Sequence, residues 1–521
     1  MKKIKVCIPT AGIGRRLGNI TKVLNKSLVD IDLKPAISHI IDNFPKNTEF
    51  VIPIGYKGSL VKSFLKITYP ERKFLFVKVD KFRGNGSGLG LTLLKAKKYL
   101  QSPFIFISCD TIFKGKIPNL KTNWVGFSDK KNLNKYRGIK INKRKKVLSF
   151  LNKKFKSTKS NKTYIGIAGV KNYKDFWKNM EADKIKSIRL GEIFGLMELK
   201  DKILAKSFEW NDIGNLKDLK YAKDRINKNS KKHNILEKSD EKIWFANNKV
   251  IKFFNNETIV RNRIKRSKIL KNYIPKIISS KKNLYSYNYY DGEIFSNIDN
   301  FDIFKKLLNL IWKFHNSKKK MFNKNFQLKC LKFYKNKTYK RLDLFYEKFN
   351  IEDKETIINN SNIPKLKTIL ENINWKYISK GLICNFHGDL HFENILYSKK
   401  NKSFKFLDWR QDFEGDINYG DAYYDYAKLM HGLLVSHEMV RKNKYVIRWR
   451  RDSINYSINS KKIYKQYIKH FIFWLNKKKI DVRKVNFITG LIFLNIAALH
   501  HFPYSLFLYA IGKKMVFENK I

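Results

Sequence analysis

The sequence has little glycine, proline and cysteine, and it is short of acidic residues. With 25 Gly and 10 Pro in 521 residues, it is neither collagen-like nor dominated by flexible linkers. Its four Cys residues are far apart and include no Cys-x-x-Cys pair, so neither a disulfide framework nor a structural zinc site is expected. This cysteine usage favours a reducing compartment, and we expect a cytoplasmic protein.

What the chain does contain is ample apolar material. Hydrophobic residues make up 43% and aromatic residues 14%, which is enough for buried cores. A chain of this length is expected to hold about two to four domains. One long apolar stretch, residues 485–511, is interrupted by two Asn, two His and one Pro. A bilayer would have to bury these polar groups, so we expect a buried helix pair here and no membrane span.

The excess of positive charge allows two interpretations. Lys and Arg number 109 against 44 Asp and Glu, a formal net charge of +65. Such a surface could bind nucleic acid, an anionic membrane or a polyanionic substrate. Alternatively, the charge reflects a general bias toward Lys, because the Lys residues are spread along the whole chain. We favour the second interpretation, and nucleic acid is not an expected partner.

The first 220 residues alternate strand and helix signals. The expected strands are 4–8, 50–54, 74–79 and 104–108, and the expected helices are 34–44, 60–65 and 89–100. This alternation predicts an α/β domain whose mostly parallel sheet is covered by helices on both faces. Ligands of such sheets lie at the carboxyl ends of the strands.

A polar, poorly periodic stretch at residues 221–240 marks a domain boundary. After it, residues 243–254 are predicted to form a hairpin that turns at Asn247 and Asn248. Signals beyond residue 302 are mainly helical, with short strands near 394–408. We therefore predict domains at residues 1–225 and 235–521, joined by a linker at 226–234.

A glycine-containing loop directly follows the first strand. Gly12 and Gly14 would let the backbone approach a phosphate closely, and the nearby cations Arg16 and Lys26 suit a triphosphate. Two further features follow in the chain: an apolar strand ending in Asp110, and a late Trp-Asn-Asp string.

Together these motifs resemble the AGxGxRL…KxL signature of the sugar-phosphate and choline-phosphate nucleotidylyltransferases, so we expect a Rossmann-like N-terminal domain. The resemblance implies catalytic roles for Lys26 and Arg16 and an Mg²⁺ site formed by Asp110 and Asp212. It also implies nucleotide contacts from two loops, which are Ala11, Gly12, Gly14, Gly86, Ser87 and Gly88. The region of residues 120–200 matches only loosely, so the acceptor stays open.

The second half contains the string His387-Gly388-Asp389-Leu390-His391-Phe392-Glu393-Asn394, followed by Asp408 after a short hairpin. It resembles the aminoglycoside phosphotransferase and choline kinase superfamily, which has a protein-kinase-like α+β fold. The resemblance implies that Asp389 accepts the proton of a substrate hydroxyl and that Asn394 and Asp408 bind Mg²⁺ on ATP. Lys252 would grip the phosphates of ATP, although no glycine-rich string precedes it.

Two neighbouring pairs of residues are expected to have structural roles. His387 and His391 have the spacing of metal ligands, but no third ligand is evident, and ordering of the catalytic loop is the favoured role. Asp421 and Asp425 also fit the superfamily, and we expect them to brace the loops.

We therefore expect a bifunctional transferase. A small-molecule kinase would phosphorylate an alcohol or sugar with ATP, and a nucleotidyltransferase would activate that phosphate with CTP, or with UTP. Such products suit capsule or lipopolysaccharide biosynthesis. Two alternatives stay open: two activities on unrelated substrates, and a basic binding protein with a degenerate kinase-like scaffold. A homo-oligomer also stays open.

Overall fold

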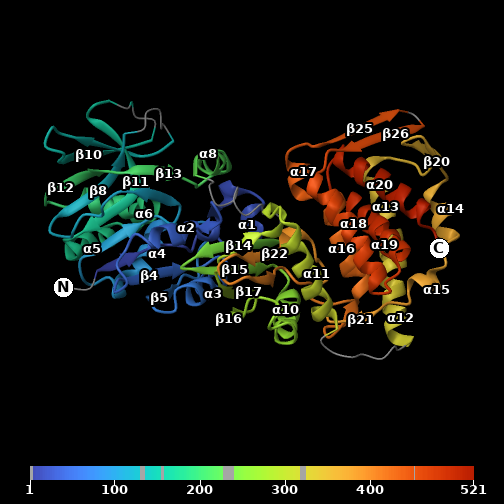
Figure 1. The fold of residues 1–521 in the computed structure, drawn as a ribbon. Helices are drawn as coiled ribbons and strands as arrows, with labels where there is room; N and C mark the ends of the chain where they lie inside the picture. Colours follow the sequence, from blue (N-terminus) through green and yellow to red (C-terminus); the bar gives the residue numbers. More distant parts are fainter. Residues whose placement is uncertain are drawn as a thin grey trace. The chain divides into compact units, whose positions relative to one another are not determined.

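The computed structural model describes residues 4–129, 135–153, 156, 158–226, 240–316, 324–450 and 452–521. Apart from Ile226, the predicted linker lies outside them. The chain forms two compact units, an N-terminal unit of Met1–Glu257 with Ile278–Tyr289 and a C-terminal unit of Thr258–Ile277 with Tyr290–Ile521 (Figure 1). In the described ranges, no helix combines the length and the hydropathy that crossing a membrane requires.

Four parallel strands form the centre of the N-terminal unit. They pair in the order β6-β1-β4-β5, and their bounds are β1 Lys5–Cys7, β4 Glu49–Ile54, β5 Lys73–Lys78 and β6 Phe104–Ile107. All four expected strands are thus confirmed, and their parallel pairing brings their carboxyl ends to one edge of the sheet.

The rest of this nine-stranded sheet is largely antiparallel. Strand β11 (Asn161–Val170) runs antiparallel to β6, to β8 (Asn123–Ser128) and to β9 (Gly138–Ile141). Strands β10 (Val147–Leu151) and β12 (Ile203–Ser207) complete it. The sheet is mixed, so the prediction of a mostly parallel sheet is correct only for its first half. Beyond β6, no described helix separates β8, β9, β10 and β11, and short connections of this kind favour antiparallel neighbours.

Helices cover both faces of the sheet, as expected (Figure 1). One face buries Val6 and Phe50 with side chains of α2 (Ala36–Ile41) and α3 (Gly58–Thr68). The next residues along the same strands, Cys7 and Val51, lie in a second core, which also contains side chains of α4 (Leu89–Ala96) and α5 (Tyr173–Ala182). This alternation is the two-residue period of strands that are buried on both sides.

A second sheet in the same unit has the order β14-β15-β17-β16. The bounds of its strands are β14 Glu241–Ala246, β15 Lys249–Phe254, β16 Ile277–Lys281 and β17 Leu284–Asn288. The predicted hairpin is confirmed, because β14 pairs antiparallel with β15. Asn247 and Asn248 form its turn with φ values of 50° and 54°, and Asn tolerates this left-handed conformation.

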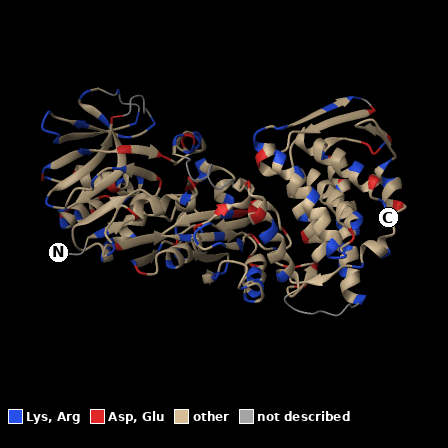
Figure 2. Cartoon of the chain, viewed as in Figure 1, with Lys and Arg blue, Asp and Glu red and all other residues tan. Residues whose placement is uncertain are grey.

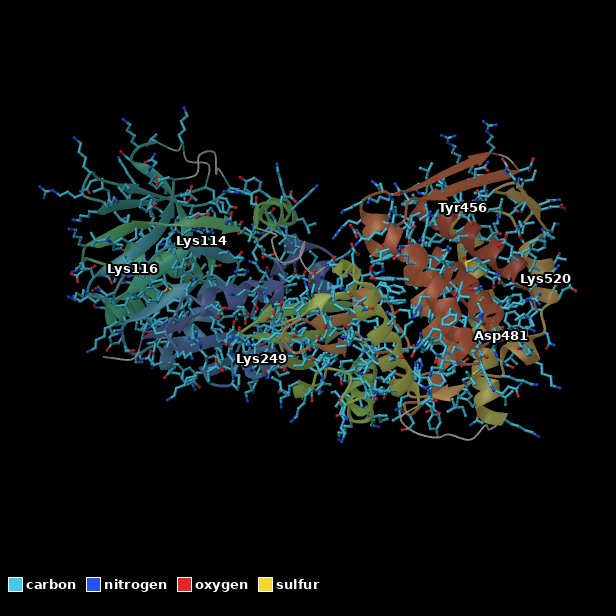
Figure 3. All side chains as sticks on the ribbon, viewed as in Figure 1. Lys114, Lys116, Lys249, Tyr456, Asp481 and Lys520 are labelled. Atoms are coloured by element: carbon cyan, nitrogen blue, oxygen red, sulfur yellow. The ribbon has the colours of Figure 1, made fainter. Side chains whose placement is uncertain are left out.

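This sheet packs into the core of the N-terminal unit. The indole of Trp244 lies edge-on against Phe64 of α3, with ring centroids 5.3 Å apart. Lys249, labelled in Figure 3, donates hydrogen bonds of 3.0 Å to the carbonyls of Ile67 and Thr68. The compact unit therefore extends well past residue 225. The assignment of one activity to residues 1–225 and of the other to residues 235–521 remains a prediction.

The C-terminal unit is mainly helical. Its longest helices are α10 Glu257–Ile269 (which begins one residue before the unit), α11 Phe301–His315, α13 Lys337–Phe349, α16 Ala422–Leu434, α18 Lys462–Lys477, α19 Val482–Ala497 and α20 Tyr504–Glu518. A hairpin of β22 (Ile395–Ser398) and β23 (Ser403–Phe406) lies between the predicted catalytic loop, which ends at Asn394, and Asp408.

The expected buried helix pair is confirmed by α19 and α20. Leu494 and Phe507 are fully buried. The amide of Asn495, one of the polar residues in this apolar stretch, donates to Thr338 Oγ1 at 3.0 Å and to the Leu491 carbonyl at 2.7 Å. These partners satisfy the NH₂ group of the amide, while its Oδ1 is buried without a hydrogen-bond partner among the described residues.

Candidate active sites

The glycine loop after β1 lies directly against Lys26. Gly14 has a φ of 74°, and a Cβ at this position would lie 3.0 Å from the Lys26 Cβ. The amide of Asn25 donates to the carbonyls of Thr10 at 2.9 Å and Tyr56 at 2.6 Å. Asn25 therefore fixes the position of the loop relative to the cation beside it.

The structure brings three of the predicted N-terminal residues around one glycine. Asp110 follows β6, and Asp212 ends β13 (Glu209–Asp212), which pairs antiparallel with β7 (Thr111–Lys114). A Cβ on Gly214 would lie 2.7 Å from Asp110 Oδ2, 3.1 Å from Asp212 Oδ1 and 3.2 Å from Arg16 Nη2. A side chain at this position would have to displace the ends of the carboxylate and guanidinium groups that meet here.

The charges at this point are coupled. The ammonium group of Lys26 forms an ion pair with Asp110. Burial opposes ionisation of Asp110, but the charge of Lys26 outweighs it and lowers the pKa of Asp110. Burial and the nearby charge of Asp110 raise the pKa of Asp212. Two carboxylates that repel each other in this way are the hard oxygen donors that Mg²⁺ prefers, so the donor set fits that ion.

Sequence reasoning missed two groups beside this site. The hydroxyl of Tyr136 donates to Asp212 Oδ2 at 2.5 Å and to Asp218 Oδ2 at 3.0 Å. Glu192 is buried at the start of α7 (Glu192–Met197) and accepts a 3.0 Å hydrogen bond from Tyr164. Burial raises the pKa of Glu192 to about 7. Both groups come from the loosely matching part of the sequence, where no motif marked them.

The remaining residues predicted to contact the nucleotide are Ala11, Gly12 and the loop from Gly86 to Gly88. Gly12 has open space around its Cα, and the backbone amide of Tyr56 donates to the Ala11 carbonyl at 3.0 Å. A Cβ on Gly88 would lie 2.4 Å from the Ile188 carbonyl of α6 (Lys184–Leu190), so this glycine serves close packing. The nucleotide contacts of this loop, from Gly86 to Gly88, stay predictions.

In the C-terminal unit, the hairpin brings the predicted catalytic residues together. Asn394 precedes β22 and Asp408 follows β23, and the amide of Leu407 donates to the Asn394 carbonyl at 2.7 Å. The Asn394 amide donates to Asp389 Oδ2 at 3.1 Å and to the Asp389 carbonyl at 2.9 Å. Asp408 has a φ of 56°, a costly conformation that is common at functional sites.

Two cations flank the carboxylate of Asp389. Lys428, on α16, lies 2.8 Å from Oδ1, and His391 Nε2 lies 3.5 Å from Oδ2. Burial opposes ionisation of Asp389, but Lys428 and His391 outweigh it and hold its pKa well below the ordinary value. The sequence motif did not identify Lys428, because it lies 39 residues from Asp389 on a separate helix.

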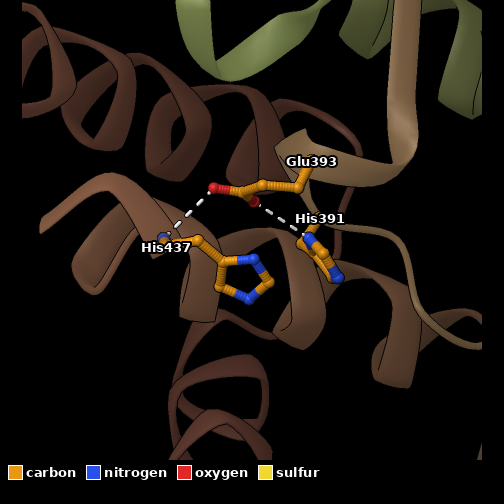
Figure 4. Close-up of side chains that lie close together, drawn as sticks. All are labelled: His391, Glu393 and His437. Atoms are coloured by element: carbon orange, nitrogen blue, oxygen red, sulfur yellow. Dashed lines mark hydrogen bonds and ion pairs between the residues drawn. The ribbon is translucent and has the colours of Figure 1, made fainter. Parts of the chain in front are cut away.

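The two histidines of the motif have different surroundings. His387 Nδ1 accepts the backbone amide of Asp389 at 3.2 Å, while His391 Nδ1 lies 2.9 Å from Glu393 Oε2 (Figure 4). Glu393 Oε1 accepts the backbone amide of His437 at 3.1 Å. His391, Glu393 and His437 each offer a ligand atom within 4.8 Å of the others. Since both oxygens of Glu393 already accept hydrogen bonds, the geometry suits ordering of the loop.

Of the two acidic residues expected to brace the loops, Asp425 on α16 binds the catalytic loop, while Asp421, just before α16, binds other segments. Asp425 accepts the backbone amides of His387 at 2.6 Å and Gly388 at 2.7 Å. Asp421 accepts the Tyr334 hydroxyl at 2.6 Å. Lys252 lies in the other unit, buried on β15, and its role stays a prediction.

The N-terminal part of the chain is similar to curated proteins named bifunctional protein GlmU. The relative from Methanococcus vannielii is 27% identical over 231 residues, covering 42% of this chain and 54% of that protein. The relative from Methanocaldococcus jannaschii is 28% identical over 229 residues, with the same coverage. The chain thus spans about half the length of these relatives. No family model matches the chain.

Two solved structures resemble part of the chain. The CTP:phosphocholine cytidylyltransferase from Streptococcus pneumoniae has a TM-score of 0.37 and 17% identity, covering 43% of this chain and 98% of that one. The inositol-1-phosphate CTP transferase from T. maritima has a TM-score of 0.35 and 13% identity, covering 44% and 98%.

Proposed function

We propose that the N-terminal unit is a nucleotidyltransferase. The observation that carries the proposal is the convergence of Arg16, Asp110 and Asp212 on Gly214, with Lys26 paired to Asp110. Two cations and two carboxylates at the carboxyl edge of a parallel sheet suit a triphosphate and its metal ion. The similarity to GlmU proteins supports the same class of reaction.

In the reaction, an oxygen of a phosphate monoester attacks the α-phosphorus of the nucleoside triphosphate. The bond from that phosphorus to the bridging oxygen breaks, and pyrophosphate leaves. The nucleophile is already an anion, so the chain need not supply a base. Lys26 and Arg16 neutralise and align the phosphates. Asp110 and Asp212 would hold Mg²⁺, which adds positive charge on the triphosphate when bound.

We propose that the C-terminal unit is a small-molecule kinase that uses ATP. Asp389 would accept the proton of the attacking hydroxyl, and Asn394 and Asp408 would hold Mg²⁺ on the nucleotide. The joint placement of these residues at one end of the β22–β23 hairpin supports the proposal. Lys428, beside Asp389, would keep the carboxylate ionised and ready to accept a hydrogen bond.

We further propose that the two reactions run in sequence. The kinase would make a phosphate ester, and the transferase would join it to a nucleotide from CTP, or from UTP, as an activated building block for capsule or lipopolysaccharide. The test is a product screen by mass spectrometry, with ATP, CTP or UTP, and a panel of polyols, amino alcohols and sugars. We expect a nucleoside diphosphate derivative from one alcohol. Asp110→Asn should stop pyrophosphate release but not the kinase. Absence of metal-dependent ATP turnover would instead favour a scaffold.

A further inference from the structure

Lys428, beside the predicted catalytic base, belongs to a group of three neighbouring cations. The Lys337 ammonium lies 4.4 Å from the centroid of the Phe333 ring, and the Arg410 guanidinium lies 4.9 Å from the same ring. Lys428 lies 2.8 Å from Asp389. We call Lys337, Arg410 and Lys428 the basic cluster.

The basic cluster is built from three separate segments. Lys337 begins α13 directly after a π-helical turn, Lys332–Asn336, and such turns are frequent at functional sites. The Arg410 Cβ would lie only 2.6 Å from a Cβ on Gly388, so Arg410 packs onto the catalytic loop. Tyr424, one turn before Lys428 on α16, packs edge-on against Phe333 with ring centroids 4.7 Å apart.

Among the described residues, two of these three cations form no ion pair with a carboxylate. In the described part of the C-terminal unit, Lys428 pairs with Asp389, but neither Lys337 nor Arg410 has a carboxylate oxygen within 4.0 Å. Glu414 attracts Lys337 without forming an ion pair. Burial, with repulsion from Arg410, Lys428 and also Arg341, lowers the pKa of Lys337 to about 7. A half-buried cation in this position gains from an external anion.

We propose that the basic cluster binds an anionic group, a carboxylate or a phosphate, on the alcohol that the C-terminal unit phosphorylates. The inference rests on the proposed kinase function and names its substrate class, a hydroxy acid or an already phosphorylated alcohol. In the reaction, the hydroxyl oxygen bonds to the γ-phosphorus of ATP and the bond to the β-phosphate oxygen breaks. ADP leaves, and the hydroxyl proton passes to Asp389 and then to water. A cationic alcohol such as choline would be repelled by the same three cations.

The first test compares alcohols that differ in charge. Glycerol, D-glycerate, glycerol 3-phosphate and choline are each offered to the full chain with ATP and Mg²⁺, and ADP formation is measured. We expect turnover of one or both anionic alcohols in preference to glycerol and choline. The glycerate and glycerol 3-phosphate arms separate a carboxylate from a phosphate. Preferential turnover of choline or glycerol would overturn the proposal and leave the kinase function intact.

Variants then assign the effect to the cluster. Lys337→Gln and Arg410→Gln should each raise the KM for the anionic alcohol about tenfold to a hundredfold, the loss expected for one charge-assisted hydrogen bond. The KM for ATP should not change. Lys340→Gln is the matched control, because Lys340 is exposed on the same helix, one turn further along α13. A rise in the KM for ATP instead would assign the cluster to the nucleotide and contradict the proposal.

A binding measurement keeps the inference separate from the kinase reaction. D-Glycerate and inorganic phosphate are titrated calorimetrically into the full chain with ADP and Mg²⁺ already bound. Binding that is lost in Lys337→Gln and kept in Lys340→Gln supports the anion site even if no alcohol is phosphorylated, and in that case only the kinase function fails. No binding of either probe, or equal binding by both variants, would overturn the anion site.

Discussion

Glu192 is a carboxyl group that folding makes harder to ionise. Burial raises its pKa from an ordinary 4.5 to about 7. Between these pH values the folded protein holds a proton that the unfolded chain has lost, so the contribution of Glu192 lowers stability as pH rises from 4.5 through 7. We predict that Glu192→Gln removes this loss. The free energy of unfolding of the variant, compared with that of the unchanged protein, should therefore increase by up to about 3 kcal/mol from about pH 5 to about pH 8.

Urea unfolding of both proteins at the two pH values measures this gain. Tyr164→Phe is the control, because it keeps the carboxyl group and removes the hydroxyl that stabilises its charged form. That variant should show a pH dependence at least as steep as the unchanged protein. Equal pH dependence in the unchanged protein and in Glu192→Gln would contradict the assigned pKa.

Asp389→Asn replaces one carboxylate oxygen and should separate the two proposed activities. The change keeps the size of the side chain but removes the proton acceptor, so phosphorylation of the alcohol should fall about a hundredfold to ten-thousandfold. Pyrophosphate release from CTP with a supplied phosphate ester should persist in the same preparation. Loss of both activities in a protein that is still folded would show that the sites are not independent.

At the scale of elements, Trp244 tests how firmly β14 belongs to the N-terminal unit. Its side chain is fully buried against Phe64 and Phe253. Trp244→Ala should lower the free energy of unfolding by about 3–5 kcal/mol, because removal of this large side chain leaves a cavity between two packed layers. Chemical unfolding followed by a signal from the N-terminal unit measures it. Trp449→Ala, at a Trp that is 43% exposed, is the control and should change little.

Local signals predicted individual elements better than their assembly. The hairpin at β14 and β15 was predictable because Asn247 and Asn248 mark a turn between two apolar runs. The direction of β11 was not, since it depends on partners more than 50 residues away, such as Ile107 for Ile167. Motif spacing placed Asp389 and Asn394 together for the same local reason, and the two residues are hydrogen-bonded. It missed Lys428, which only the packing of α16 brings to them.

At the scale of the whole molecule, the positive charge is spread over both units. Figure 2 shows Lys and Arg throughout each of them, and no single arm of the described chain concentrates the charge. This distribution agrees with a general Lys bias. The unpaired positive charge at Lys337 and Arg410 therefore says more about function than the net charge does. Charges on an open surface are screened beyond about 8 Å in physiological salt, whereas half-buried charges are screened less.

If the two reactions form one sequence, two defective chains should complement each other. Asp110→Asn makes the phosphate ester but cannot activate it, and Asp389→Asn has the opposite defect. Mixed together with alcohol, ATP and CTP, they should restore the nucleotide-linked product, more slowly than the unchanged chain, because a tether can raise the local concentration of an intermediate to about the mM range. Mass spectrometry of the mixture measures the product. Two active preparations that yield only the free phosphate ester would favour unrelated substrates.

The packing of β14, β15 and β17 against α3 has a consequence for a gene that is divided into two and encodes the chain as two polypeptides. A split between residues 226 and 240 would give a first product that lacks the partner of Phe64 and a second product that begins with strands whose apolar side is uncovered. Each product would expose apolar surface that the intact chain buries. Produced in one cell, the two polypeptides should associate and purify as a complex. If they were encoded by separate genes, both genes would have to preserve the complementary surfaces.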